Sequence, residues 1–322
     1  MILILSTRDD PHARLVLEEL QARGVASTLV DAAELGSEHT ITVSYPGGAT
    51  WTRADGETID LSAVRCLWFR RLRFPTLQMH PLLQHRRFVL DEWKELITGL
   101  FLSMEATVIN ELRHQIFCPK GLQLREASRV GLRVPSTIMT NDAASVSAFS
   151  RELPRGVVHK AFRPMGRRSL DTRVLEPEHL EALDSLYLAP VIFQERIDKR
   201  ADVRVMWVDG RVFAVAFEAD DEQIDSRLNI DAPWDVIELP AEIELRIAAL
   251  MGRLGLRIAA LDLVIDEHGG FVFLEVNPQG QFLYLEILTG LPITRAVADL
   301  LIAAAAEGAV PRTRAGSMEA LP

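Results

Sequence analysis

The chain has 322 residues, of which 48% are hydrophobic and 25% charged, a composition typical of a globular protein with room for two or three packed units. Its formal net charge of −10 argues against general affinity for nucleic acids, and no apolar run approaches the length that spans a membrane. Cys66 and Cys118 lie far apart without metal-site spacing, which favours a reducing compartment, and residues 1–5 are too short for a signal-peptide core. We therefore expect a cytoplasmic enzyme.

The first region, residues 1–115, begins with a strand, a helix and a second strand. This order indicates a parallel α/β unit. The helix ends at Gly24, a common helix stop. The predicted elements are a strand at 2–5, a helix at 11–23, strands at 26–30, 40–45, 49–53 and 64–69, a helix at 87–104 and a linker at 110–115.

The remainder of the chain alternates further helices and strands. Gly131 ends the first helix of the second region, and Asn141 or Asp142 caps the next helix. The second region has predicted helices at 120–130, after 142 and near 178–186, and strands at 134–139, 156–161 and 191–196. The third has strands at 203–208 and 212–217, a helix at 240–254, a hairpin at 258–277 and a helix at 293–306, before a tail at 311–322 predicted to be mobile.

Three oxygen ligands face one side of the hairpin. Glu275 and Asn277 point the same way from its second strand, and the turn brings Asp262 of the first strand beside Glu275. Two carboxylates and a carboxamide at the mouth of a sheet suit Mg²⁺. The alternative is a buried acidic pair tied up with arginines. The metal interpretation is favoured, because each acid interrupts an apolar run and unpaired buried carboxylates are costly.

Two lysines are candidates for contacting the phosphates of ATP. Lys160 ends a predicted strand and faces the glycine-containing loop at 163–169, where backbone N–H groups can approach phosphate oxygens. Taken alone, this pattern is more often a solvated loop. Lys120, at the start of a helix, is commonplace on its own.

The segment around Gln194 is a more specific signal. An apolar strand that ends in Gln-Glu can form a hinge that binds adenine by backbone hydrogen bonds. Glu195 or a nearby acid would then hold a ribose hydroxyl. Arg204 can stabilise a transferring phosphoryl group, and Arg227 lies in a polar loop. For each arginine alone a structural salt bridge is the better interpretation, but the joint order of these motifs favours function. The candidate nucleotide-binding residues here are Gln194, Glu195, Arg196, Ile197, Asp202 and Asn229.

This order of motifs resembles the ATP-grasp superfamily over roughly the whole chain up to the closing helix. The resemblance implies a three-domain α/β fold, with an N-terminal pre-ATP-grasp domain at 1–115, a central ATP-grasp lobe at 116–197 and a C-terminal lobe with the Mg²⁺ site at 198–310. It also implies roles for single residues. Lysines 120 and 160 would contact phosphates, residues 194–197 would form the adenine hinge, and the residues matched to the γ-phosphate and the metal are Arg204, Asp262, Glu275 and Asn277.

Finer features are similar to the microviridin-type graspetide ligases, which crosslink ribosomally made precursor peptides by esters or amides between side chains. The features are Cys66-Leu-Trp-Phe-Arg-Arg71, Gly131-Leu-Arg-Val-Pro-Ser-Thr137, Thr140-Asn-Asp142, the segment from Glu275 to Glu286, and Thr289-Gly-Leu-Pro292. There are two departures. Family members often carry Asn-Pro where this chain has Asn110-Glu111, and Asp-Trp-Arg where it has Asp225-Ser-Arg227.

The resemblance implies that ATP and Mg²⁺ activate a side-chain carboxylate as an acyl phosphate, which a Ser or Thr hydroxyl or a Lys amine attacks. Arg204 and Arg227 are the candidate catalytic residues. The partner would be a precursor peptide with a leader and an acid-rich core, not nucleic acid or membrane. Arg70 or Arg71, in a stretch without acids, would guide the core carboxylates; the alternative, equally favoured, is that these arginines pair with distant carboxylates. The oligomeric state is left open, a homodimer included.

Two other classes compete with this interpretation. One is an ATP-grasp ligase that adds free amino acids to a protein or small molecule, which the Trp68-Phe-Arg-Arg71 element disfavours. The other is a non-catalytic ATP-binding module, which has no need of a complete Mg²⁺ set. Product assays with free amino acids and ATPase assays with peptide would distinguish them.

Overall fold

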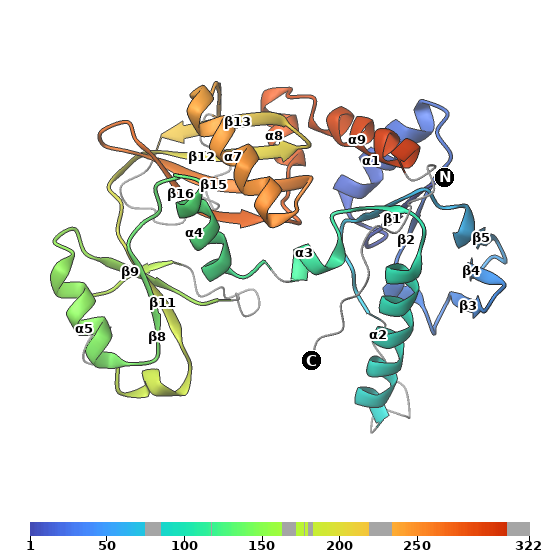
Figure 1. Ribbon diagram of the computed structural model, residues 1–322, viewed down its shortest axis with the longest axis horizontal. Helices are drawn as coiled ribbons and strands as arrows, with labels where there is room; N and C mark the ends of the chain where they lie inside the picture. Colours follow the sequence, from blue (N-terminus) through green and yellow to red (C-terminus); the bar gives the residue numbers. More distant parts are fainter. Residues whose placement is uncertain are drawn as a thin grey trace, which may run out of the picture. The chain divides into compact units, whose positions relative to one another are not determined.

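The structure is a computed structural model that describes residues 1–74, 85–116, 118–162, 172–176, 178–179, 183–218 and 234–307. The chain forms two compact units, each with its own hydrophobic core (Figure 1). The first comprises Met1–Gln115, Gln281–Glu286 and Pro292–Pro322, and the second Ile116–Gly280 and Ile287–Leu291. The closing helix thus belongs to the first unit, whereas the predicted domain ranges place it in the third region.

A parallel sheet organises the first unit. All residues of its strands β1 and β6 are buried, as expected for continuous apolar runs in a covered parallel sheet. The strand order is β2-β1-β6-β7, so the chain proceeds from β1 to β2 on one side and then returns to β6 on the other. The strands are β1 (Ile2–Leu5), β2 (Ser27–Val30), β6 (Cys66–Phe69) and β7 (Thr107–Ile109).

Helices and a small meander complete this unit. The helices α1 and α9 pack on each other, and α9 also contacts β1, β6 and β7 (Figure 1). Ile97 and Phe101 of α2 join the core formed by alternate residues of the sheet and by Trp51 of the meander. The elements are α1 (Pro11–Ala22), α2 (Arg86–Ser103), α3 (Leu112–Ile116), α9 (Ile293–Glu307), η1 (Ala32–Glu34), η2 (Leu61–Ala63), β3 (Thr40–Ser44), β4 (Gly48–Thr52) and β5 (Thr58–Asp60).

The second unit contains two antiparallel sheets. In the smaller one the strand order is β10-β9-β11-β8, and Val157 and Phe193 on one face pack with Val146 of α5. Residues on the other face are Lys160, which lies opposite Ile192, and Gln194, which lies opposite Val158. The elements of this part are β8 (Thr137–Thr140), α5 (Ala143–Glu152), β9 (Val157–Lys160), β10 (Arg173–Val174), η4 (Leu183–Leu188) and β11 (Val191–Glu195).

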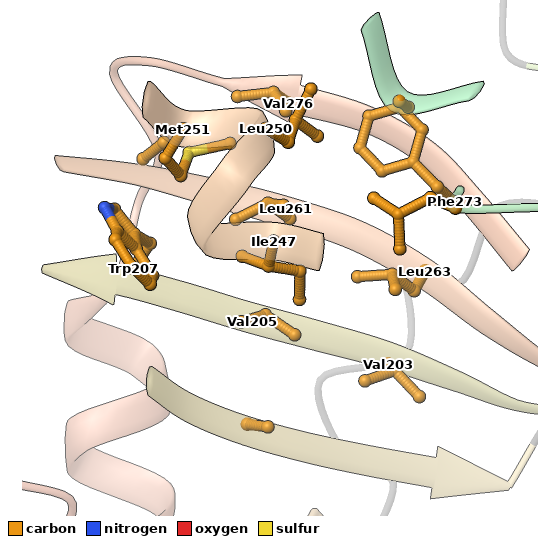
Figure 2. Close-up of a cluster of buried hydrophobic side chains, with 14 of the residues drawn as sticks. Val203, Val205, Trp207, Ile247, Leu250, Met251, Leu261, Leu263, Phe273 and Val276 are labelled. Carbon is orange, nitrogen blue, oxygen red and sulfur yellow. The ribbon is translucent and has the colours of Figure 1, made fainter. Parts of the chain in front are cut away.

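The larger sheet has the order β14-β13-β12-β15-β16, with β16 at one edge. Alternate residues such as Val205 and Leu261 point towards Ile247 and Leu250 of helix α7 and form a closed apolar core (Figure 2). The residues between them therefore face the opposite side of the sheet. The elements are α4 (Lys120–Arg129), β12 (Lys199–Val208), β13 (Arg211–Glu218), β14 (Asp235–Ile237), α7 (Ala241–Leu254), β15 (Ile258–Asp266), β16 (Phe271–Asn277) and α8 (Leu283–Thr289), whose last turn lies in this unit.

Most predicted elements are present, including the hairpin and the helix that Asp142 caps. The predicted linker at 110–115 was wrong, because residues 112–116 form α3, which Gln115 anchors by donating hydrogen bonds to the carbonyls of Phe69 and Asn110. The strand expected from residue 134 begins at Thr137, since Arg133 pairs instead with Val272 of the other sheet. The loop at 163–169 and the tail at 311–322 lie outside the described residues. None of the described helices is long and apolar enough to cross a membrane.

Candidate functional site

The predicted metal ligands meet on the face of the larger sheet that turns away from α7. Asp262 of β15 lies directly opposite Glu275 of β16, and Asn277 lies two residues further along, opposite Ala260. Directly opposed residues have Cβ atoms about 5 Å apart, so their oxygens can converge on one ion. Two half-buried carboxylates and an exposed carboxamide are a donor set that fits Mg²⁺ and leaves room for other oxygen ligands.

A β-bulge at this point determines which side chains of β16 face the core and which face Asp262. Asp262 pairs with Glu275 but Leu263 pairs with Phe273, so Leu274 is an additional residue on β16. Phe273 and Val276 can therefore both enter the core, where each is at most 4% exposed, although they are three residues apart. Bulges often redirect side chains beside functional sites. Here the bulge leaves Glu275 facing Asp262.

Two cations accompany these two acids. The Nζ atom of Lys120, in the first turn of α4, lies 3.0 Å from Oε2 of Glu275. Arg204 of β12 lies opposite Asp262 in the sheet and forms an ion pair with it. The acids are thus paired with basic residues, as the alternative interpretation of the hairpin supposed. Both partners are nevertheless residues predicted to contact phosphates. The site therefore contains acidic groups that suit a metal ion and basic groups that suit a triphosphate.

The turn after Asn277 is tightly held. The N–H of Gln279 donates to Oδ1 of Asn277 over 3.0 Å, and the N–H of Gly280 donates to its carbonyl over 3.1 Å. A Cβ atom at position 280 would lie 2.2 Å from Cβ of Ala260, so only glycine fits against β15. Sequence reasoning did not single out Gly280, although its place after Asn-Pro-Gln was a visible signal.

The predicted adenine hinge lies at the end of β11. Gln194 is buried, and its Nε2 donates to Oγ1 of Thr137 over 3.0 Å. Glu195 makes two hydrogen bonds with Ser136. Its N–H donates to the Ser136 carbonyl, and its carboxylate accepts the Ser136 N–H. These bonds join β11 to the start of β8. Arg196 and Ile197 follow directly, the first exposed and the second half-buried.

The remaining predicted residues fall in different places. Asp202 shares a face of β12 with Arg204, and it is buried and accepts a 2.6 Å hydrogen bond from Lys199. Arg227 and Asn229 lie outside the described residues. No group of three or more His, Cys, Asp or Glu suited to a metal occurs in the described parts of the chain, so the candidate metal set depends on the amide of Asn277.

A second charged cluster lies in the first unit, at the carboxyl ends of β1 and β6. The Nε atoms of Arg70 and Arg71 lie 3.4 and 3.6 Å from Oδ2 of Asp10, which also accepts a 2.9 Å hydrogen bond from Ser6. This is where the strand order of the parallel sheet reverses, the position at which such sheets bind ligands. Arg70 is buried and 31% of the Arg71 side chain is exposed, so Arg71 alone of the pair reaches solvent.

Burial governs the titration of this cluster. It lowers the pKa of Arg70 to about 10, against the attraction of Asp10. Burial alone would raise the pKa of Asp10, but Arg70, the Ser6 hydroxyl and Arg71 together lower it. Burial and the positive charge of Arg70 lower the pKa of His12 to about 4. Its Nδ1 accordingly accepts long hydrogen bonds from the N–H groups of Phe282 and Leu283.

Comparisons with known proteins agree with these arrangements. Residues 1–115 match the family model of the MvdD pre-ATP grasp domain. A crystal structure of macrocyclase MdnC bound with precursor peptide MdnA, from Microcystis aeruginosa MRC, has a TM-score of 0.86 and 27% identity, covering 94% of this chain and 99% of that one. Macrocyclase MdnB from the same organism has a TM-score of 0.80 and 28% identity, covering 94% and 98%.

A structure of the ATP-grasp ligase PsnB, complexed with a phosphomimetic variant of minimal precursor, Mg and ADP, has a TM-score of 0.78 and 26% identity, covering 94% of this chain and 98% of that one. No curated protein matches the chain. The predicted fold, an ATP-grasp fold with an N-terminal pre-ATP-grasp domain, is confirmed by these matches.

Proposed function

Because the chain belongs to the microviridin-type graspetide ligases of the ATP-grasp superfamily, we propose that it crosslinks a ribosomally made precursor peptide with ATP and Mg²⁺. It activates Asp or Glu side chains of the peptide and joins them to Ser or Thr hydroxyls or Lys amines. The observation that carries the proposal is the meeting of Asp262, Glu275 and Asn277 on one sheet face, with Lys120 and Arg204 against the two acids. The need for ATP and the small number of cysteines, Cys66 and Cys118, support a cytoplasmic location.

The chemistry follows from the poor leaving group of a carboxylate. One carboxylate oxygen takes the γ-phosphoryl group of ATP, and ADP leaves. The hydroxyl or amine then attacks the carbonyl carbon, the bond between that carbon and the phosphorylated oxygen breaks, and inorganic phosphate leaves. The nucleophile loses one proton, and the peptide loses one water for every crosslink.

The residues of the chain would position and compensate charge in these steps. Asp262, Glu275 and Asn277 would hold Mg²⁺, which when bound neutralises charge on the phosphates. Lys120 and Lys160 would contact the ATP phosphates. The catalytic residues would be Arg204 and Arg227, both directed to the oxygens of the transferring phosphoryl group. The adenosine would be held by Gln194, Glu195, Arg196, Ile197, Asp202 and Asn229.

The charged cluster of the first unit suggests how the peptide is held. Arg70 and Arg71 both face the carboxylate of Asp10. We assign Arg71 to contact with the acid-rich core, because its side chain reaches solvent, and Arg70 to holding Asp10. A bound peptide carboxylate would share the guanidinium of Arg71.

The test is a crosslinking assay with ATP, Mg²⁺ and the peptide encoded by a short acid-, Ser- and Thr-rich reading frame beside the gene. Mass spectrometry should detect the loss of one water per crosslink. The double variant Asp262→Asn, Glu275→Gln should be slower by about 10³-fold, as expected when several kcal/mol of charge stabilisation are lost. Glu267→Gln, which neutralises an acid in the turn of the same hairpin, should react normally.

Wild-type turnover by the double variant would refute the proposal. Modification of free amino acids by the wild-type enzyme, with no reaction of the peptide, would point instead to a carboxylate–amine ligase for small substrates.

A further inference from the structure

A buried glutamine of α4 makes a second connection between this helix and the strand of the metal ligands. Gln123 is only 4% exposed and lies three residues after Lys120, so its side chain is one helical turn further along α4. Nothing in its sequence surroundings distinguishes it. A buried amide is costly unless its donors and its acceptor are satisfied, so its partners identify what it does.

The three shortest hydrogen bonds of the Gln123 amide go to backbone groups, and a fourth, longer one of 3.6 Å goes to Sγ of Cys118. Its Oε1 accepts the N–H of Val276 over 2.8 Å, and its Nε2 donates to the Val276 carbonyl over 3.0 Å. The second N–H of Nε2 donates to the carbonyl of Cys118 over 2.8 Å, two residues before Lys120. A glutamine amide has two donor hydrogens, and both are used here.

The bonded residue of β16 is the one between two predicted metal ligands. Val276 points into the core and is 4% exposed, whereas its neighbours Glu275 and Asn277 face the other side of the sheet. Gln123 bonds both polar backbone groups of Val276, as a residue of an added strand would. The backbone position of the two ligands therefore depends on this amide.

The strand needs such support for two reasons. Among the strands that the structure describes, β16 is the last of its sheet, and on its outer side it has only the isolated bridge between Arg133 and Val272. It also contains the bulge at Leu274, which interrupts the regular pairing with β15 immediately before Glu275. Arg133 accepts the N–H of Phe273 before the bulge, and Gln123 holds Val276 after it.

We propose that Gln123 is a positioning residue for the Mg²⁺ site, which fixes Glu275 and Asn277 relative to the first turn of α4 and to Lys120. This inference rests on the proposed function, because it takes these two residues as metal ligands. Gln123 touches neither the metal nor the substrate. It acts through the backbone of Val276 and through the carbonyl of Cys118, so that the strand carrying metal ligands and the helix carrying a phosphate-binding lysine keep one relative position.

The experiment measures metal binding directly. Mn²⁺ is titrated into the full-length protein with saturating ADP and followed by electron paramagnetic resonance, and ADP binding without metal is measured by calorimetry. Gln123→Met keeps the length of the side chain but removes its hydrogen bonds. We expect its Kd for Mn²⁺ to rise by about tenfold or more, the range found for outer-shell partners of metal ligands, and its Kd for ADP to change less than about twofold.

A matched variant separates positioning from general destabilisation. Ala127→Gly affects the same helix at a fully buried position that makes no bond to Val276. Glycine weakens the helix by about 1 kcal/mol, yet the Mn²⁺ affinity should stay unchanged. An equal loss of Mn²⁺ binding in Ala127→Gly and Gln123→Met, or wild-type binding in Gln123→Met, would overturn the assignment of Gln123.

The control for the proposed function is the double variant Asp262→Asn, Glu275→Gln, which should abolish Mn²⁺ binding. If it binds Mn²⁺ normally, the metal site is elsewhere and the assignment of Gln123 fails with it. If Gln123→Met does not fold, amide hydrogen exchange of the wild-type protein decides. Slow exchange at Val276 is expected, and exchange as fast as that of an open edge strand would contradict the role of Gln123.

Discussion

The two units hold charged residues in contrasting ways. In the first, the side chains of Asp10 and Arg70 are 0% and 2% exposed, whereas in the second those of Lys120 and Glu275 are 26% and 22% exposed. A buried pair cannot exchange partners without leaving an uncompensated charge in a poorly solvated place. A half-exposed pair can, because water assists the exchange. The first arrangement suits a fixed framework, and the second suits a site in which phosphates and a metal ion replace internal partners.

The largest expected effect on stability comes from removing the buried cation. In Arg70→Met the carboxylate of Asp10 keeps its burial and loses its nearest cation. The free energy of unfolding should fall by about 3–5 kcal/mol, the usual cost of breaking a buried ion pair, as measured by urea denaturation. Arg71→Met, at the half-exposed partner, should cost less than about 1 kcal/mol. A stable Arg70→Met protein would remove the distinction between the two clusters.

The pH dependence of stability should reveal the same burial through His12. Its pKa is about 4 in the folded protein, against an ordinary value of 6.5, so between these values only the unfolded chain binds the proton. Stability should therefore decrease as the pH falls from 6.5 to 4, by up to about 3 kcal/mol. Urea denaturation at a series of pH values measures the slope. His12→Asn keeps a hydrogen-bond acceptor near the Phe282 N–H but does not titrate, so the slope of stability against pH should become smaller. An unchanged slope would mean that other groups cause the pH dependence.

The turn beside the candidate metal ligands should show an intermediate effect. Gly280→Ala places a methyl group against Ala260, so the turn after Asn277 must shift, at a cost of about 1–3 kcal/mol in thermal or urea unfolding. Gly252→Ala, in α7, meets nothing within 4 Å and should leave stability unchanged or raise it slightly. Equal behaviour of the two variants would mean that the turn is not rigid.

The smallest effect on stability should come from the open ion pair. Lys120→Met should change the free energy of unfolding by less than about 1 kcal/mol, because the pair with Glu275 is half-exposed. Its ATP affinity should nevertheless fall by about tenfold, or about 1.4 kcal/mol, as measured by calorimetry with Mg²⁺. Lys94→Met, at an exposed lysine of α2, is the control and should bind ATP normally. Unimpaired ATP binding in Lys120→Met would remove this lysine from the nucleotide site.

Local patterns predicted much of the fold and named the candidate residues. The alternation in residues 271–277 is sufficient to place Glu275 and Asn277 on one face, and the structure pairs Asp262 with Glu275. No pattern in the sequence predicted the bulge at Leu274, because the bulge depends on which residues of β15 and β16 come into register. Asp10 was not singled out either, because an acidic residue before a helix is expected to be a helix cap. Asp10 is indeed a cap, since its side chain accepts the His12 N–H.

Most of the elements, the hairpin with its candidate oxygen ligands and the family resemblance were predictable from the sequence alone, because periodicity and motif spacing are properties of neighbouring residues. The tertiary structure decided which cation meets which acid and how the edge strand is held. Lys120 reaches Glu275, and Gln123 bonds Val276, across more than 150 positions of the chain. Such contacts arise only when the helix and the strand pack together, so no local pattern encodes them.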